Sequence, residues 1–142
     1  MSCEFGFDSR NGILRCRVRG HVTDEIMMEY CRVAEDYFAR ICPLRGLYDF
    51  STVISFEISA QAIRELARRA PAMPDPSRVR VIVAPTYNMF MLARMFQFLG
   101  ARTRPNLHIV RTQREAWQVM GVYRPQFERL SEDVSEGVLA YR

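Results

Sequence analysis

Hydrophobic and polar residues alternate with two different periods along this chain, and each period predicts its own kind of element. Near the N-terminus they alternate residue by residue on both sides of Asn11-Gly12, which predicts a β-hairpin closed by a two-residue turn. That turn would pair Phe7 with Cys16 and Asp8 with Arg15. One face of the hairpin is then apolar, and we expect the other, which carries acidic residues and a stripe of arginines, to be a solvated surface.

A helical period of about 3.6 residues appears in four later stretches. Thr23 is placed to cap the first, Ser59 the second, and Thr112 begins a capping box with Glu115 before the last. The predicted helices cover residues 24–41, 60–70, 87–99 and 113–120. Apolar runs between them predict strands at 45–50, 78–84 and 107–111, and residues 51–58 are interpreted as a connecting segment.

Strands and helices alternate along residues 1–121, which predicts a single α/β domain. We expect a mixed, mostly parallel sheet with an N-terminal hairpin and about four helices. Residues 122–142 are interpreted as a C-terminal tail or short docking helix, because four apolar residues follow an approximately helical spacing there: Phe127, Leu130, Val134 and Val138.

The helix predicted over 87–99 is unusually apolar, with apolar side chains over roughly two-thirds of its circumference, where a core-facing helix needs a stripe of about 100°. We expect it to bury more surface than its own domain covers, against a second copy in a homodimer, another regulatory protein or an apolar small molecule. Arg94 interrupts this surface and either snorkels over it, turns toward an acid such as Asp49, or binds an anionic head group. The candidate contact residues are Phe90, Met91, Arg94, Met95 and Phe98.

Composition narrows the class of protein. The chain has 142 residues, 49% of them hydrophobic and 25% charged, as in a globular domain. No apolar run reaches the ~18 residues of a membrane span, and the N-terminus does not resemble a signal peptide, so we expect a cytoplasmic protein. The net charge of +4 is modest and the arginines are scattered, so we do not expect nucleic acid as a partner.

Few residues suggest chemistry. The four cysteines form no Cys-x-x-Cys pair, and neither His21 nor His108 has metal-ligand spacing to other residues, so we expect no metal and no cofactor. Nucleophile elbows, phosphate loops and dinucleotide fingerprints are absent from the sequence, which indicates that the protein is not an enzyme. Asp49 and Ser51 lie where the carboxyl end of a predicted strand meets a loop, which is where open α/β sheets place ligands. The alternative is a turn in which both satisfy backbone groups.

Ser59 is a candidate phosphorylation site. A phosphate on its hydroxyl would lie at a helix N-terminus, where backbone N–H groups and the helix dipole stabilise negative charge. The alternative is an ordinary N-cap, in which the hydroxyl accepts a backbone hydrogen bond.

Several blocks of the sequence resemble STAS-like (SpoIIAA-like) domains, the fold of anti-sigma-factor antagonists. The likeness is greatest to a bacterial branch of uncharacterised function, and it covers Cys3–Gly121. Its blocks are Gly20-His21-Val22-Thr23, Arg45–Ser51, Arg78–Ala84, Phe90–Phe96 with its single Arg94, Val110-Arg111 and Glu115-Ala116-Trp117.

The resemblance implies a regulatory module without metal or catalytic step. In the antagonists, an Asp-Ser-Ser-Gly-Leu block holds the phosphorylated serine. Here Glu57-Ile58-Ser59-Ala60-Gln61 stands in that place, so the serine is kept and the glycine is not.

Four functions remain open at this stage. The first is a non-enzymatic STAS-like module that acts by protein contact or by binding a small apolar ligand. The second is a phospho-regulated switch that uses Ser59. The third is a carrier of a lipid or acyl ligand, with Arg94 at the head group. The fourth is an enzyme that uses the Asp49 region, which requires a pocket with a perturbed titratable group beside it.

Overall fold

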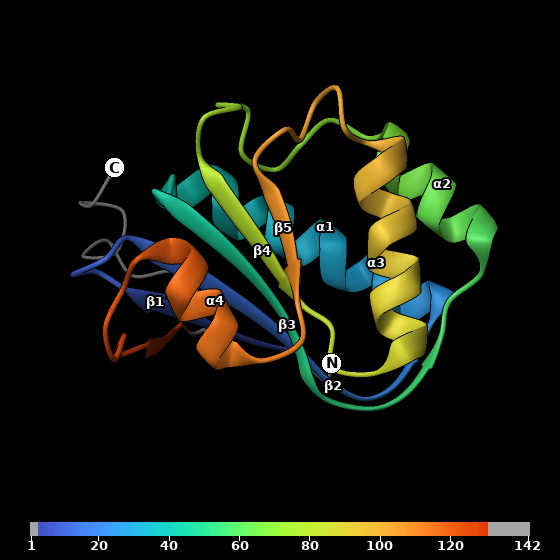
Figure 1. Cartoon of the computed structure of the whole chain (residues 1–142), viewed down its shortest axis with the longest axis horizontal. Helices are drawn as coiled ribbons and strands as arrows, with labels where there is room; N and C mark the ends of the chain where they lie inside the picture. The colour runs from blue at the N-terminus through green and yellow to red at the C-terminus, as the bar shows by residue number, and fades with distance from the viewer. Residues whose placement is uncertain (1–2, 131–142) are drawn as a thin grey trace.

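A six-stranded mixed sheet forms the centre of the computed structural model, which describes residues 3–130 (Figure 1). The strands are β1 (Cys3–Asp8), β2 (Ile13–Thr23), β3 (Arg45–Glu57), β4 (Val79–Val83), β5 (Leu107–Val110) and β6 (Glu128–Leu130). Their order is β5-β4-β3-β2-β1-β6. The four strands from β2 to β5 are parallel, whereas β1 is antiparallel to both β2 and β6. The predicted α/β class and mixed sheet are therefore confirmed.

The four helices of the described chain are α1 (Asp24–Ile41), α2 (Ala60–Arg68), α3 (Tyr87–Leu99) and α4 (Gln113–Met120). Each begins at a hydroxyl side chain that accepts a backbone hydrogen bond from the residue three positions later. Three of these caps, Thr23, Ser59 and Thr112, are the ones predicted from the sequence. These local signals explain why the helix boundaries agree so closely with the expected ones.

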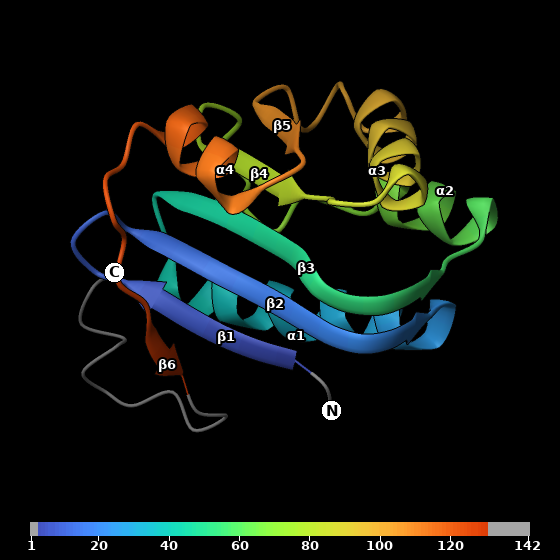
Figure 2. The ribbon, with the colours of Figure 1, turned by 60° about the horizontal axis from the view of Figure 1, so that its bottom comes forward.

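The sheet is covered on both faces. Helices α1, α2 and α3 pack over a large apolar core on one face, and α4 packs on a smaller core on the other (Figure 2). Side chains of β2 alternate between the two, so Cys16 enters the large core and Ile13 the small one. The face under α1, α2 and α3 is called the three-helix face below, and the opposite one the α4 face.

The hairpin turn is longer than predicted. Residues 9–12 form a four-residue loop, which pairs Phe7 with Leu14 and Asp8 with Ile13. The Asp8 carboxylate closes the loop by accepting hydrogen bonds from the Asn11 backbone N–H at 3.0 Å and from its side-chain amide at 2.9 Å. The predicted partners are therefore wrong by two residues, but an even shift leaves every side chain on its expected face.

Strand β3 also differs from the prediction, since it continues through the expected connecting segment to Glu57. Strand β2 extends to Thr23 and pairs in parallel with β3 as far as Glu57, which gives these residues backbone partners. The neighbouring strand β4 is shorter, and its last pair joins Val83 to Asp49. Asp49 therefore lies inside a strand, at the level where β4 ends.

After Gly121 the sequence predicts a tail or short docking helix, but the described part ends in strand β6. This strand pairs with the outer edge of β1, where a strand would otherwise expose unpaired backbone groups. The backbone N–H of Gln126 donates to the Asp8 carboxylate at 3.0 Å, which helps to fix the approach to the edge. Val134 and Val138 lie outside the described residues.

Candidate functional site

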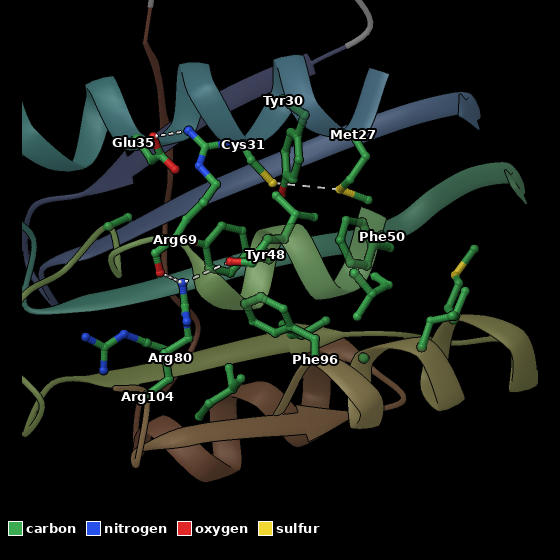
Figure 3. A pocket seen from close by; sticks show the side chains of 18 of the residues that line it. Met27, Tyr30, Cys31, Glu35, Tyr48, Phe50, Arg69, Arg80, Phe96 and Arg104 are labelled. Carbon is green, nitrogen blue, oxygen red and sulfur yellow. Dashed lines mark hydrogen bonds and ion pairs between the residues drawn. The ribbon is translucent and has the colours of Figure 1, made fainter. Parts of the chain in front are cut away.

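A pocket of about 90 Å³ lies on the three-helix face, between α1, α2, α3 and the sheet (Figure 3). Most of its wall is apolar and aromatic, with Met27 and Tyr30 from α1, Tyr48 and Phe50 from β3, and Phe96 from α3. Small residues at Ala70, Ala72 and Ala93 line it too, and they leave space that larger side chains would fill. Such a shape suits a small, largely apolar molecule.

One end of the pocket is strongly basic. Figure 3 shows Arg69, Arg80 and Arg104 together at the end where Glu35 lies, away from Met27 and Phe50. Arg69 forms an ion pair with Glu35 at 2.9 Å, and both side chains are partly exposed. The pocket thus has a charged end whose outer ion pair is partly exposed and an apolar end where Met27 and Phe50 are buried.

Arg80 and Arg104 are buried, with 3% and 8% of their surface exposed. Arg80 donates to the carbonyl oxygens of Met73, Asp75 and Arg78. Arg104 donates to three carbonyls at the end of α2, those of Leu66, Ala67 and Arg69, at 3.4, 3.2 and 2.9 Å. A helix C-terminus attracts positive charge, which explains why the chain tolerates Arg104 there.

The carbonyl bonds satisfy the guanidinium donors but do not cancel their charges. The two carboxylates that act on these arginines electrostatically, Asp75 and Glu35, form ion pairs with Arg78 and Arg69 instead. Burial lowers the pKa of both Arg80 and Arg104, yet a guanidinium stays protonated in proteins. The pocket lining therefore carries an excess of positive charge.

The thiol and phenol groups of the pocket are neutral at pH 7. Burial raises the pKa of the Cys31 thiol to about 12, so it carries almost no reactive thiolate. Burial also raises the pKa of both tyrosines, Tyr30 and Tyr48, above the usual range of a phenol. Neutral phenol and thiol groups beside fixed arginine charges suit binding better than acid–base or nucleophilic chemistry.

Of the candidates predicted on α3, Met91, Arg94 and Phe98 lie on its exposed side, whereas Phe90 and Met95 pack against the large core. Within residues 3–130, the helix lines the pocket with Met89, Leu92, Ala93 and Phe96. Arg94, Met91 and Phe98 are exposed, whereas Phe90 and Met95 are partly buried. The guanidinium of Arg111 lies 5.2 Å from the Phe90 ring centre. None of these five residues lines the pocket, and Met91, Arg94 and Phe98 form an exposed outer surface of α3. A homodimer through this surface stays a prediction.

Asp49 and Ser51 lie on the α4 face, away from the pocket. Asp49 is fully buried and accepts hydrogen bonds from Nε of Arg17 at 2.9 Å and from the Gln113 amide at 3.1 Å. It also accepts a hydrogen bond from the Ser51 backbone N–H at 2.9 Å. This bond agrees with the alternative interpretation, in which Asp49 satisfies a backbone group. Ser51 contacts the same Gln113 amide through its hydroxyl. These residues join α4 to the sheet, and Arg17, not Arg94, is the partner of Asp49.

The hairpin face expected to be solvated is half-buried. Glu4, Arg15 and Arg17 have only 16–17% of their side-chain surfaces exposed. Phe127, which precedes β6, covers Arg15 with its ring centre 4.3 Å from the guanidinium carbon. The sequence did not predict this cover, because it comes from a segment more than one hundred residues away.

Ser59 caps α2 and also ties it to α1. Its hydroxyl donates to the Asp24 carboxylate at 2.7 Å and accepts the Ala62 backbone N–H at 3.1 Å. Its backbone N–H donates to the same carboxylate at 2.8 Å. The capping role is therefore observed, and a phosphate there would face the negative charge of Asp24. Phosphorylation stays a prediction.

Comparison of the chain with protein-family models, with curated proteins and with solved structures gives no match. The STAS-like resemblance therefore rests on the sequence blocks alone. Among residues 3–130, no group of three or more His, Cys, Asp and Glu side chains could hold a metal ion. No helix in this described part is long and apolar enough to cross a membrane.

The pocket arginines are the residues that sequence reasoning missed. Arg80 could have been found, because it is a charged residue in an otherwise apolar strand and a buried charge needs a specific environment. Arg104 sits in a turn beside Arg102, and its burial depends on α2, which lies more than thirty residues earlier. No local sequence pattern distinguishes the buried Arg104 from the exposed Arg102.

Proposed function

We propose that this chain is a small, non-enzymatic STAS-like module that binds a small apolar ligand in the pocket on the three-helix face. A cytoplasmic regulatory role, in which ligand binding changes what the module contacts, fits this proposal. The observation that carries it is the pocket itself: an aromatic wall around about 90 Å³ with charged side chains at one end. Pockets with apolar walls and a few convergent polar groups are typical of ligand sites.

The neutral thiol and phenols of the pocket support binding without catalysis. The mixed α/β sheet and the four helices are compatible with the STAS-like type, and the sequence blocks give the reason for naming it.

Native mass spectrometry of protein purified from its own host tests the ligand directly. We expect a small-molecule adduct that is lost on denaturation. In Ala72→Phe the new ring would fill the pocket, so the adduct should disappear, whereas Ala101→Phe, at an exposed residue outside the lining, should keep it. An empty wild-type protein that also fails to bind fatty acids would contradict the proposal.

A second candidate is contact with another protein through the outer surface of α3, and one observation favours it. Phe98 is 81% exposed and Met91 48%, and the same helix also exposes Tyr87 and Leu99 at its two ends. Clustered exposed apolar side chains mark contact surfaces more often than scattered ones do. Light scattering should give a dimer mass that Phe98→Glu reduces to a monomer and Arg114→Glu, on α4, leaves unchanged. A monomeric wild type would remove the homodimer version.

A further inference from the structure

The two ends of the pocket differ in chemistry, and this difference limits the kind of ligand it can take. Met27 and Phe50 lie at the apolar end, Phe96 lines the middle, and the three arginines stand at the other end (Figure 3). A molecule that fills such a site is apolar over most of its length and polar at one terminus.

The sign of the polar terminus follows from the charges. The lining holds Arg69, Arg80 and Arg104 but one acidic side chain, Glu35. Glu35 pairs with Arg69, so the charges of Arg80 and Arg104 are left without a carboxylate partner in the described structure. Buried charges are costly unless an opposite charge is near, so a ligand that brings a negative charge would be favoured and one that brings a positive charge would be disfavoured.

We propose that the ligand is an amphiphilic anion, with its acidic group at the arginine end and its apolar body against the aromatic wall. This inference rests on the proposed function, because it names the ligand class of the same pocket. One water, which is about the size of one carbon or oxygen atom of a ligand, needs roughly 10–15 Å³ of such space. A pocket of about 90 Å³ therefore fits a chain of about six carbons with its acidic group.

Arg69 is the residue that meets the acidic group. It stands at the mouth, where 39% of its side chain is exposed, and its partner Glu35 is 36% exposed. An ion pair this open to solvent contributes little to stability, so a ligand carboxylate can replace Glu35 at low cost. Arg80 and Arg104 keep their carbonyl partners and act on the ligand through their charge.

A series of three probes of equal chain length tests the inference: hexanoate, 1-hexanol and hexylamine, titrated into isotope-labelled protein and followed by NMR. We expect hexanoate to bind about tenfold more tightly than 1-hexanol, as charge-assisted hydrogen bonds exceed neutral ones, and hexylamine to bind most weakly. Equal or tighter binding of 1-hexanol would overturn the anion inference and leave the proposed function standing. Failure of all three probes would count against both.

Two variants at the mouth should act in opposite directions. Arg69→Gln should lower the affinity for hexanoate about fivefold, and Glu35→Gln should raise it, because it removes the carboxylate that competes for Arg69. Neither should change the affinity for 1-hexanol. Arg68→Gln, which changes the same charge at an exposed residue outside the lining, is the control and should have no effect. Equal effects of Arg69→Gln and Arg68→Gln on hexanoate would overturn the role of Arg69.

Discussion

Asp49 is the residue on the α4 face whose loss should cost the most stability, because it forms a buried ion pair with Arg17. Nε and one terminal nitrogen of Arg17 both lie 2.9 Å from the same carboxylate oxygen of Asp49, and Asp49 is fully buried. Removing one partner of a buried ion pair leaves the other charge without compensation, which is more costly than losing a hydrogen bond.

Asp49→Asn should therefore lower the free energy of unfolding by about 3 kcal/mol in urea denaturation. Ser51→Ala is the matched control: it removes an exposed hydroxyl that touches the same Gln113 amide, and should change stability by about 0.5 kcal/mol or less. If Asp49→Asn and Ser51→Ala had the same free energy of unfolding, the buried ion pair with Arg17 would not contribute to stability in this way.

At the scale of elements, agreement with the sequence depends on how local the signal is. Helix starts agree because each cap hydroxyl acts within three residues of itself. The length of β3 was missed because Ser51–Glu57 are strand only through pairing with β2, a partner from another part of the chain. The apolar surface of α3 was expected to need a partner, and a partner on its outer side stays a prediction. Its other side lines the pocket.

The Ser59 cap of α2 should give a pH-dependent contribution to stability. Hydrogen bonds from the Ser59 hydroxyl and then its backbone N–H hold the pKa of Asp24 below its ordinary 3.8. A carboxyl whose pKa is lower in the folded state stabilises the fold above its unfolded pKa, and this stabilisation is lost as the pH falls through the folded pKa.

Ser59→Ala should cost about 1 kcal/mol near pH 7, the typical value of an N-cap, and less as the pH falls below about 4. Chemical denaturation at a series of pH values measures the difference. Thr86→Ala removes the cap of α3, a hydroxyl that pairs with no carboxylate in the described structure, so its cost should not vary over this range. A constant difference for Ser59→Ala from neutral to acid pH would contradict the role of Asp24.

At the scale of the whole molecule, the sheet separates two regions with different tasks. The three-helix face holds the pocket, and the α4 face holds the buried charges around Asp49 and Arg15. Neither assembly could be predicted from the sequence, since each draws side chains from elements that are distant along the chain. Arg80 comes from β4, Arg104 from the turn before β5, and the carbonyls that bind Arg104 from the end of α2.

The segment that leads into β6 completes the α4 face. A change in this segment therefore tests whether the α4 face and the pocket are independent. The Phe127 ring lies 5.9 Å from that of Trp117 and covers the Arg15 guanidinium, while β6 pairs with β1 from Phe5 to Phe7. Phe127→Ala should lower the free energy of unfolding by about 2 kcal/mol, from lost ring packing and the lost cation–π contact, and speed hydrogen exchange in β1.

The control is Tyr123→Ala, because Tyr123 is 81% exposed and its loss should cost about 0.5 kcal/mol or less. If the faces are independent, both variants should bind hexanoate with the affinity of the wild type, since sites without shared partners act additively. A loss of hexanoate binding in Phe127→Ala at temperatures where the variant is folded would mean that the sheet transmits changes from the α4 face to the pocket. The packing of Phe127 over Arg15 would then influence ligand binding from the opposite face of the sheet.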